Sequence, residues 1–210
     1  GIYGKAMRNG LWSLKTVNIR DYADDKHKTV DDTVFGGGSG MLMKPDIVAN
    51  SLDKNISKGE KIFYLSPKGK KFNQSFANSL SKQNGINLIC GHFEGVDDRL
   101  LSTRNIEEIS IGDYVLSGGE TAAFVILDAV LRLIPGVLGN KDSIKDETFE
   151  NSLLEYPQFT KPKIWEGKSV PDVLFSGDHA KIKSWRLSQS EDITRRQRPD
   201  LWEKYLKDKK

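Results

Sequence analysis

The sequence contains few of the residues that build disulfide frameworks or metal centres. It has one cysteine, Cys90, and three histidines scattered along 210 residues. A single cysteine excludes an internal disulfide framework, and the histidines lack the spacing of a zinc site. Cys90 ends the apolar run INLIC, where a free cysteine behaves as a small buried hydrophobe. We therefore predict no structural metal, and a packing function rather than a nucleophilic one for Cys90.

Long apolar runs are also missing. No stretch of eighteen apolar residues occurs, and the opening GIYGKAMRNG has no signal-peptide pattern. The sequence has no internal repeat and no low-complexity tract, and 37% of its residues are hydrophobic and 29% charged. This composition is typical of a globular protein rather than a disordered one. We expect a cytoplasmic protein without a membrane segment.

Glycine is plentiful in one segment, 34–43, which reads VFGGGSGMLM. No Gly-Lys-Ser/Thr follows, which excludes a Walker loop, and no strand with an acidic partner frames it as a dinucleotide fingerprint. Four glycines within five residues form a backbone able to wrap a phosphate or lie over a ligand. A flexible connector explains the same composition equally well, so both interpretations stay open.

The central stretch, 109–139, joins a strand-like run to an apolar helix. The run ends at Ser117, Gly118 and Gly119, and ten of the fourteen residues in 120–133 are apolar. We predict a helix buried on nearly all sides, about 21 Å long and too short to cross a bilayer. Adjacent glycines before a helix N-terminus are typical of binding sites.

Strand, loop and helix alternate three times between residues 61 and 134. The expected strands are 61–65, 86–90 and the run before the central glycines, and each ends in a small or glycine-rich turn. This order predicts an α/β fold with a parallel sheet, in which ligands bind beyond the carboxyl ends of the strands. A further strand is expected over 11–20. Residues 145–171, with three prolines, predict a linker.

Four motifs resemble one known family. The segments LSPKG (65–69), CGHFEGVDDR (90–99), IGDYVLSGGE (111–120) and RLIPGVLG (132–139) are similar, in this order, to the bacterial tRNA (guanine-N1)-methyltransferases of the SPOUT class. The resemblance covers nearly the whole chain. It implies S-adenosylmethionine as cofactor, tRNA as substrate and a homodimer whose active site is completed by the partner's C-terminal domain.

The resemblance also implies a domain organisation. It predicts a SPOUT-type α/β domain over 1–139 that binds S-adenosylmethionine and contains a C-terminal trefoil knot. An interdomain linker over 140–177 and a small helical tRNA-binding domain over 178–210 follow. Asp178 and Pro199 are expected to start two helices in this last part. In the family another strand precedes the segment that matches residue 1.

By resemblance the cofactor contacts come from three loops. Backbone groups there would hold the adenine, ribose and carboxylate, Glu94 would accept from a hydroxyl, and Asp113 would bind the methionyl ammonium or cap a helix. The predicted cofactor residues are Tyr64, Leu65, Ser66, Pro67, Gly91, Glu94, Gly95, Ile111, Gly112, Asp113, Tyr114, Val115, Leu116, Gly118 and Gly119.

Methylation of guanine N1 requires a base near the N1 proton and a positive group near O6. By resemblance the positive group is Arg132, which also has the spacing for an i,i+4 ion pair with Asp128. The family's catalytic aspartate precedes a Ser/Thr-Phe pair. Here Glu147 stands directly before that pair and Asp146 before it, so either acid is the predicted base.

The C-terminal segment is basic. Residues 178–210 contain ten Lys or Arg and six Asp or Glu, a net charge of +4 within a chain of +3. This fits a polyanion or a solvated helical surface. By resemblance the tRNA contacts are His179, Lys181, Lys183, Arg186, Arg195, Arg196 and Arg198, whereas Trp185 either packs or stacks on a base. Alternative functions are a SPOUT ribose 2′-O-methyltransferase and a non-catalytic RNA-binding module.

Overall fold

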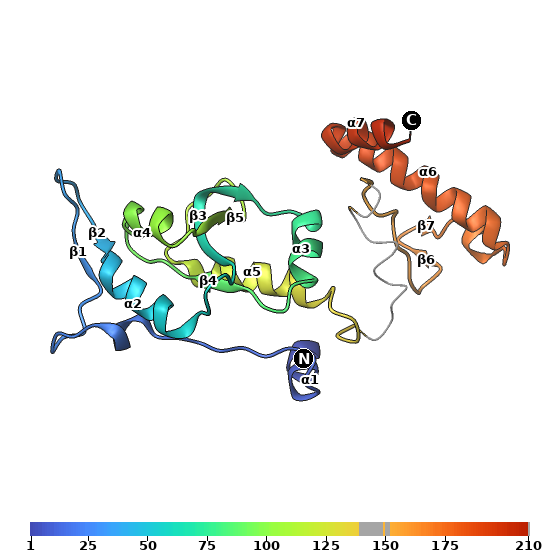
Figure 1. The fold of residues 1–210 in the computed structure, drawn as a ribbon. Helices are drawn as coiled ribbons and strands as arrows, with labels where there is room; N and C mark the ends of the chain where they lie inside the picture. Colours follow the sequence, from blue (N-terminus) through green and yellow to red (C-terminus); the bar gives the residue numbers. More distant parts are fainter. Residues whose placement is uncertain (139–148, 150–151, 210) are drawn as a thin grey trace. The chain divides into compact units, whose positions relative to one another are not determined.

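The computed structural model describes residues 1–138, 149 and 152–209 (Figure 1). The chain divides into two compact units, Gly1–Gly139 and Asn140–Lys210, which are treated separately below. Within the described residues, no helix combines the length and the apolar character needed to span a bilayer.

The first unit alternates helices and strands along the sequence. Its elements are α1 (Ile2–Arg8), η1 (Ile19–Tyr22), β1 (Asp31–Thr33), β2 (Met41–Met43), α2 (Pro45–Asn55), β3 (Ile62–Lys71), α3 (Gln74–Ser81), β4 (Asn87–Ile89), α4 (Asp98–Thr103), β5 (Glu107–Ser110) and α5 (Gly119–Leu131). Strands β4, β3 and β5 form a parallel sheet in that order, which confirms the predicted α/β class. Strands β1 and β2 form a separate antiparallel hairpin.

Strand β3 is the centre of the sheet. Its apolar run IFYL is typical of a parallel strand covered on both faces. Leu65 and Lys70 both pair with Ile109 of β5, so residues 66–69 bulge out of the ladder between them. At Gly69 a Cβ atom would lie 2.4 Å from the backbone carbon of Glu108. Only glycine therefore fits where the bulge of β3 approaches the backbone of β5 this closely.

Two apolar clusters cover the two faces of this sheet. Successive side chains of a strand point to opposite faces, and Tyr64 accordingly joins one cluster while Phe63 joins the other. The Tyr64 cluster contains Val48 and Leu52 of α2 and Leu100 of α4. The Phe63 cluster contains residues of α3 and α5, including Ile126. Helices therefore pack on both faces, as the alternating pattern predicts.

Two expectations for this unit are wrong. Residues 11–20 form no strand, although apolar and polar residues mix there as they do in strands. Among the described residues no strand pairs with this segment, and the Leu14 side chain is 54% exposed. Helix α5 is not buried on nearly all sides. Ile126 is fully buried against the sheet, but Phe124 is 72% and Val125 45% exposed, because only one side of α5 packs within this unit.

The second unit consists of a short hairpin and two helices. Its elements are β6 (Ile164–Trp165), β7 (Lys168–Ser169), η3 (Asp172–Phe175), α6 (His179–Gln197) and α7 (Pro199–Asp208). The predicted helix starts are confirmed: the Asp178 carboxylate accepts hydrogen bonds from the backbone N–H groups of Ala180 and Lys181, and Pro199 is the first residue of α7. The hairpin and η3 lie within the segment predicted to be a linker.

Candidate cofactor site

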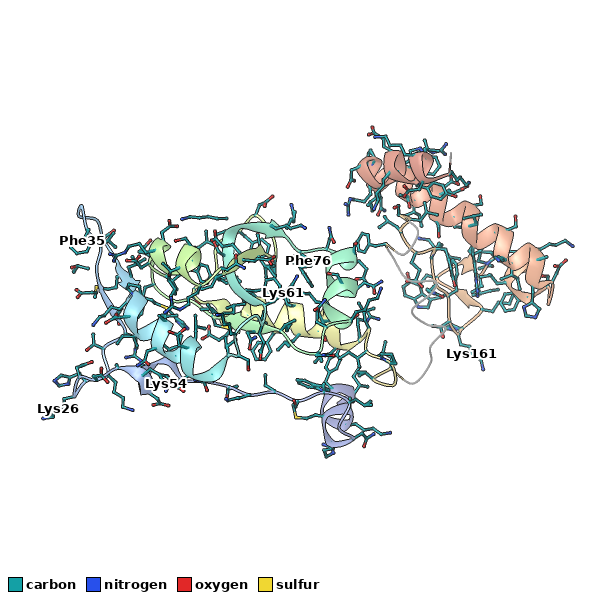
Figure 2. All side chains as sticks on the ribbon, in the orientation of Figure 1. Lys26, Phe35, Lys54, Lys61, Phe76 and Lys161 are labelled. Atoms are coloured by element: carbon teal, nitrogen blue, oxygen red, sulfur yellow. The ribbon has the colours of Figure 1, made fainter. Side chains whose placement is uncertain are left out.

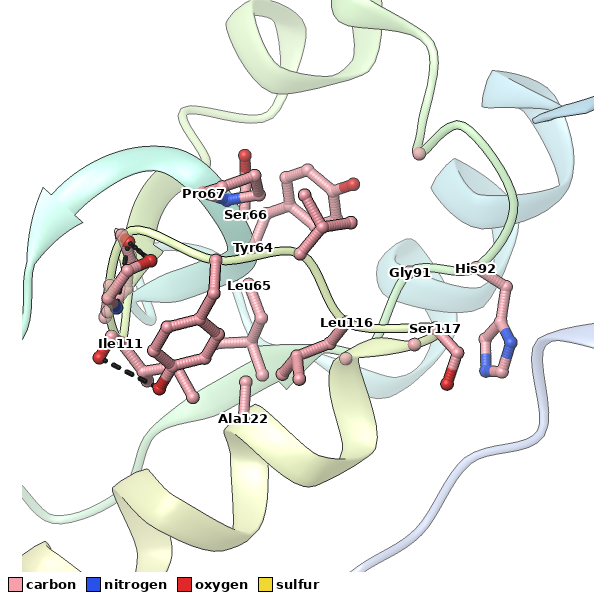
Figure 3. Close-up of a pocket in the computed structure, with 18 of the residues that line it drawn as sticks. Tyr64, Leu65, Ser66, Pro67, Gly91, His92, Ile111, Leu116, Ser117 and Ala122 are labelled. Atoms are coloured by element: carbon pink, nitrogen blue, oxygen red, sulfur yellow. Dashed lines mark hydrogen bonds between the residues drawn. The ribbon is translucent and has the colours of Figure 1, made fainter. Parts of the chain in front are cut away.

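A pocket lies where the three parallel strands end. The bulged part of β3 and the loops that follow β4 and β5 surround a cavity of about 250 Å³ against the N-terminus of α5 (Figure 3). All the predicted cofactor residues except Asp113 line it. Sequence reasoning did not select the remaining lining residues, of which the motifs contain His92, Phe93 and Ser117, whereas Ile109, Ser110 and Ala122 lie just outside them.

Asp113 is placed differently from its neighbours. Its carboxylate lies 3.2 Å from Nζ of Lys71, and both side chains are largely exposed. It does not line the pocket. The predicted contact of Asp113 with a methionyl ammonium is therefore not supported by its position within one chain.

Glycines allow the loops of the pocket to approach one another. A Cβ atom on Gly91 would lie 2.7 Å from Cε2 of Tyr64, and one on Gly95 would lie 2.8 Å from the Tyr64 hydroxyl. The Tyr64 ring thus fills the space beneath the 91–95 loop. At the start of α5, a Cβ on Gly119 would lie 2.6 Å from Cα of Cys90. Close packing therefore requires glycine at 91 and 119, and at Gly95 the positive φ of 113° requires it as well.

Cys90 has the packing function that its sequence context predicts. Burial raises the pKa of its thiol to about 11, and the negative charge of Glu120 adds to this effect. At neutral pH the sulfur therefore remains a thiol, whereas nucleophilic attack requires the thiolate. Cys90 packs as a partly buried side chain against the Phe63 cluster.

The loop after β5 forms one end of the pocket. The Ser110 hydroxyl donates to the carbonyl of Gly112 at 3.1 Å, and the Tyr114 hydroxyl donates to the carbonyl of Ile111 at 3.3 Å (Figure 3). Gly112 has φ of 156°, and a Cβ there would lie 2.4 Å from the Tyr114 ring. Val115, 87% exposed, leaves an apolar rim beside the cavity.

The other end of the pocket carries charge. Nε2 of His92 lies 2.6 Å from Oε1 of Glu120, and both side chains are about half exposed. Desolvation acts to raise the pKa of Glu120, but the hydrogen bond with His92, a backbone hydrogen bond and the His92 charge together lower it below its ordinary value. Figure 3 shows His92 beside Ser117, at the opposite end from Ile111.

The glycine-rich segment 34–43 is resolved into a hairpin turn. It joins β1 to β2. Its four glycines, Gly36, Gly37, Gly38 and Gly40, all have positive φ. Phe35 projects from the tip of the hairpin and is 97% exposed (Figure 2). The base of the hairpin is attached to the pocket, because the backbone N–H of Glu94 donates to the carbonyl of Met41 at 2.9 Å.

The predicted catalytic residues lie away from this pocket or outside the described residues. Arg132 follows the last residue of α5, whereas the pocket is at the first residue, Gly119. Thirteen residues at 1.5 Å each place the two ends about 20 Å apart. Glu147 and Asp146 lie outside the described residues. Among the residues that the structure describes, no group of three or more His, Cys, Asp or Glu could hold a metal ion.

The predicted tRNA contacts lie on α6 and at its end. Several already form ion pairs with neighbouring acids: Lys181 with Asp178, Arg195 with Asp192, and Arg198 with Asp200. Lys183 and His179 are exposed, and Arg196 donates from Nε to the carbonyl of Asp192.

Aromatic residues before α6 contact two of its side chains. The Arg186 guanidinium lies 4.8 Å from the Tyr156 ring centroid, and its Nε is buried without a hydrogen-bond partner among the described residues. Trp185 packs 6.3 Å from Phe159, which favours its packing interpretation.

The parallel sheet and the glycine-lined pocket at its carboxyl edge place the first unit in the class of α/β domains that bind ligands beyond the carboxyl ends of their strands. Comparison with known proteins specifies the class. The family model described as "tRNA (Guanine-1)-methyltransferase TrmD" matches residues 1–204. The chain belongs to this family, which confirms the resemblance carried by the four motifs.

Two relatives illustrate the similarity. A protein of Pelagibacter ubique (strain HTCC1062) named tRNA (guanine-N(1)-)-methyltransferase is 73% identical over 207 residues, which cover 99% of this chain and 91% of that protein. A protein of the same name from Brucella canis is 54% identical over 207 residues, 99% of this chain and 84% of the relative. These names favour methylation of a base over methylation of a ribose, and an enzyme over a non-catalytic module.

Proposed function

We propose that this protein, in the cytoplasm, transfers a methyl group from S-adenosylmethionine to N1 of the guanosine immediately 3′ of the anticodon in tRNA. The observation that carries the proposal is the convergence of three family motifs on one pocket. The three loops come from separate strands, yet together they line a single cavity at the carboxyl edge of the sheet.

The residues present fit an adenosyl group. The loops expose backbone donors and acceptors, and glycines at 91, 95 and 119 keep the backbone close to the cavity where a Cβ would intrude on Tyr64 or Cys90. Apolar side chains such as Leu65 and Leu116 suit a flat aromatic ring. The cofactor supplies an electrophilic methyl group, so the protein needs to orient it and exclude water.

The remaining chemistry belongs to side chains of this chain. The carboxylate of Glu147 or Asp146 would take the N1 proton, so that N1 can accept the methyl group that bound S-adenosylmethionine would supply, with S-adenosylhomocysteine as the leaving group. The Arg132 guanidinium stabilises the negative charge that develops on O6. Positioned charges of this kind contribute roughly 10²-fold to 10⁴-fold each to a rate.

We further propose that the active site forms between two copies of the chain. One reason is that Arg132 lies about 20 Å along α5 from the pocket of its own chain. The other is that α5 exposes Phe124 and Val125, an apolar surface of the kind that marks interfaces. Two α5 helices that pack in opposite directions about a twofold axis bring the partner subunit's Arg132 toward each pocket.

The knot, the domain functions and the tRNA surface are also part of this proposal. We assign cofactor binding to residues 1–139 with a trefoil knot, and tRNA binding to the helices over 178–210. The +4 charge of 178–210 supports contact with phosphates, because each Lys or Arg that neutralises a phosphate releases a counterion. We expect binding to weaken steeply with salt.

The test is transfer of labelled methyl to two tRNA transcripts that differ only in G or A immediately 3′ of the anticodon. We expect label on the G transcript alone, with 1-methylguanosine as the product nucleoside. A 2′-O-methylated product would establish the ribose alternative.

Variants test the catalytic residues. Arg132→Ala is expected to reduce turnover at least about 100-fold with unchanged cofactor affinity. Unchanged turnover in both Glu147→Gln and Asp146→Asn would exclude the proposed base.

The dimer has its own measurement. Phe124→Glu places a charge in the proposed interface, and we expect it to convert a dimer into a monomer in analytical ultracentrifugation and to abolish transfer. A wild-type protein that is active as a monomer would contradict the shared site.

A further inference from the structure

We propose that His92 and Glu120 act as a positioning pair that holds the 117–119 turn against the 91–95 loop and so sets the affinity of the pocket for its adenosyl ligand. This inference rests on the proposed function of the same pocket. Neither residue is among the cofactor contacts that the family resemblance implies.

The pair connects two loops that come from different parts of the fold. His92 follows β4, and its backbone is fixed on both sides: its N–H lies 3.5 Å from Sδ of Met43, and its carbonyl accepts from Gly95 at 3.0 Å. Glu120 lies in the first turn of α5. The contact at 2.6 Å therefore joins the loop after β4 to the helix that begins at the pocket.

The turn between them leaves space for this contact. A Cβ on Gly118 would lie 2.7 Å from Oε2 of Glu120 and 3.0 Å from Cε1 of His92. The φ of Gly118 is −168°, an extended value that any residue adopts. A methyl group at this position would have to displace the ends of the His92 and Glu120 side chains, so glycine leaves space for the pair.

The exposure and the location of the pair indicate that it affects ligand binding rather than the stability of the fold. The side chains are 48% and 55% exposed, and ion pairs with such exposure contribute little to stability. An acid in the first turn of a helix is also favoured by the helix dipole, without any function. His92, however, lines the pocket, and Gly118 and Gly119 of the same turn do so as well. Loss of the pair should therefore change ligand affinity more than stability.

The experiment is a double-mutant cycle on the affinity for S-adenosylmethionine, measured by calorimetry with the full chain. We expect His92→Ala and Glu120→Ala each to weaken binding about fivefold to tenfold, the effect of one charge-assisted hydrogen bond at a half-exposed position. The double variant should bind no more weakly than either single one, because both remove the same interaction. His92→Gln, which keeps an N–H donor, should restore affinity to within about twofold of the parent.

Two further variants sharpen the result. Gly118→Ala should weaken binding because its methyl group displaces the Glu120 carboxylate while both side chains of the pair remain. Lys28→Ala is the matched control, since it breaks an ion pair of similar exposure, Lys28 with Asp21 at 3.0 Å, away from the pocket. Its affinity should equal that of the parent.

Three outcomes would overturn the inference: unchanged affinity in both alanine variants, additive losses in the double variant, or a lowered melting temperature without a change in affinity. Failure of the proposed function is distinguishable, because the parent chain itself would then bind no S-adenosylmethionine and methylate no transcript. A parent that binds and methylates, beside unaffected variants, would contradict only the positioning pair.

Discussion

The two units differ in how their chains are held together. In the first unit, apolar clusters cover both faces of the sheet, and Phe63, Val48 and Ile126 are almost completely buried. In the second unit, among residues 149 and 152–209, Leu153 and Tyr205 are the buried apolar residues, and Ser190 and Thr194 are the buried positions of the longest helix. Hydrophobic burial therefore stabilises the first unit far more than the second.

In the second unit, where few apolar side chains are buried, polar and aromatic contacts contribute more of the stability. The Thr194 hydroxyl accepts from the backbone N–H of Leu154 at 2.8 Å, and the Tyr205 hydroxyl donates to Glu191 at 2.6 Å. Such contacts contribute about 0.5–2 kcal/mol each. We infer a rigid pocket for a small cofactor on one unit and a marginally stable, adaptable surface on the other. RNA recognition, which relies on shape and single-stranded loops, suits the second arrangement.

The largest effect is expected from the core of the first unit. Ile126→Ala removes a fully buried side chain from the cluster beneath the pocket, at an expected cost of about 2–5 kcal/mol. Urea unfolding followed by circular dichroism, with cofactor affinity measured in parallel, tests this. Ser75→Ala, on the exposed side of α3, is the control and should change stability by less than about 0.5 kcal/mol. If the two variants lowered the free energy of unfolding equally, burial in the apolar clusters would not be what stabilises the first unit.

In the second unit the corresponding change is Thr194→Val. It preserves volume but deletes the hydroxyl that accepts from Leu154 and donates to the carbonyl of Ser190 at 2.6 Å. We expect a loss of about 1–3 kcal/mol because the Leu154 N–H is left unsatisfied. Three of the four tryptophans, Trp165, Trp185 and Trp202, lie in this unit, so tryptophan fluorescence reports mainly its unfolding. Ser184→Ala on the exposed face is the control, and cofactor affinity should be unchanged in both variants.

Much of the first unit is predictable because its signals are local. The apolar run of β3, the glycines after each strand and the apolar stretch of α5 are each visible within about fifteen residues. The order of these signals leads to a parallel sheet, and the carboxyl-edge rule then places the three loops around one pocket. Asp178 is recognisable as a helix cap because capping depends on residues only two or three positions away.

Features that depend on distant partners were not predictable. Strand β3 continues to Lys71 because it pairs again with β5 beyond the 66–69 bulge, and no sequence pattern encodes that register. The 11–20 segment has strand-like residues, but among the residues that the structure describes no strand pairs with it. The burial of α5 depends on which of its faces meets the sheet. His92 and Glu120 stand 28 residues apart, so their contact requires the fold. The pairing of Arg195 with Asp192, by contrast, follows from i,i+3 spacing.

Acid should distinguish the units further. Glu191 accepts hydrogen bonds from Tyr205 and from Lys209, and these bonds lower its pKa below the ordinary value. A carboxyl group with a lowered pKa stabilises the folded state above its unfolded pKa of about 4.3, and this stabilisation is lost as the pH falls through the folded value. We expect the fluorescence melting temperature to fall below about pH 4.3 more in the parent than in Glu191→Gln. Parallel curves for the two proteins would contradict the assignment.

The smallest effect is expected from alkaline titration of the first unit. Burial, followed by the proximity of Asp128, raises the pKa of Tyr3 to about 12, and its hydroxyl lies 3.3 Å from the Asp128 carbonyl on α5. A raised folded pKa means that the stabilisation is complete below the unfolded pKa of about 10 and is lost as the pH rises through the folded value.

Tyr3→Phe should therefore change stability little at pH 7, where the phenol is neutral in both the folded and the unfolded chain. Between about pH 10 and pH 12 the parent should lose stability more steeply than the variant, because only the parent has a phenol at this position to ionise on unfolding. Urea midpoints followed by circular dichroism at pH 9 and pH 11 measure the difference. An identical pH dependence in both proteins would mean that the Tyr3 hydroxyl is as well solvated in the folded chain as in the unfolded one, and that α1 does not bury it against α5.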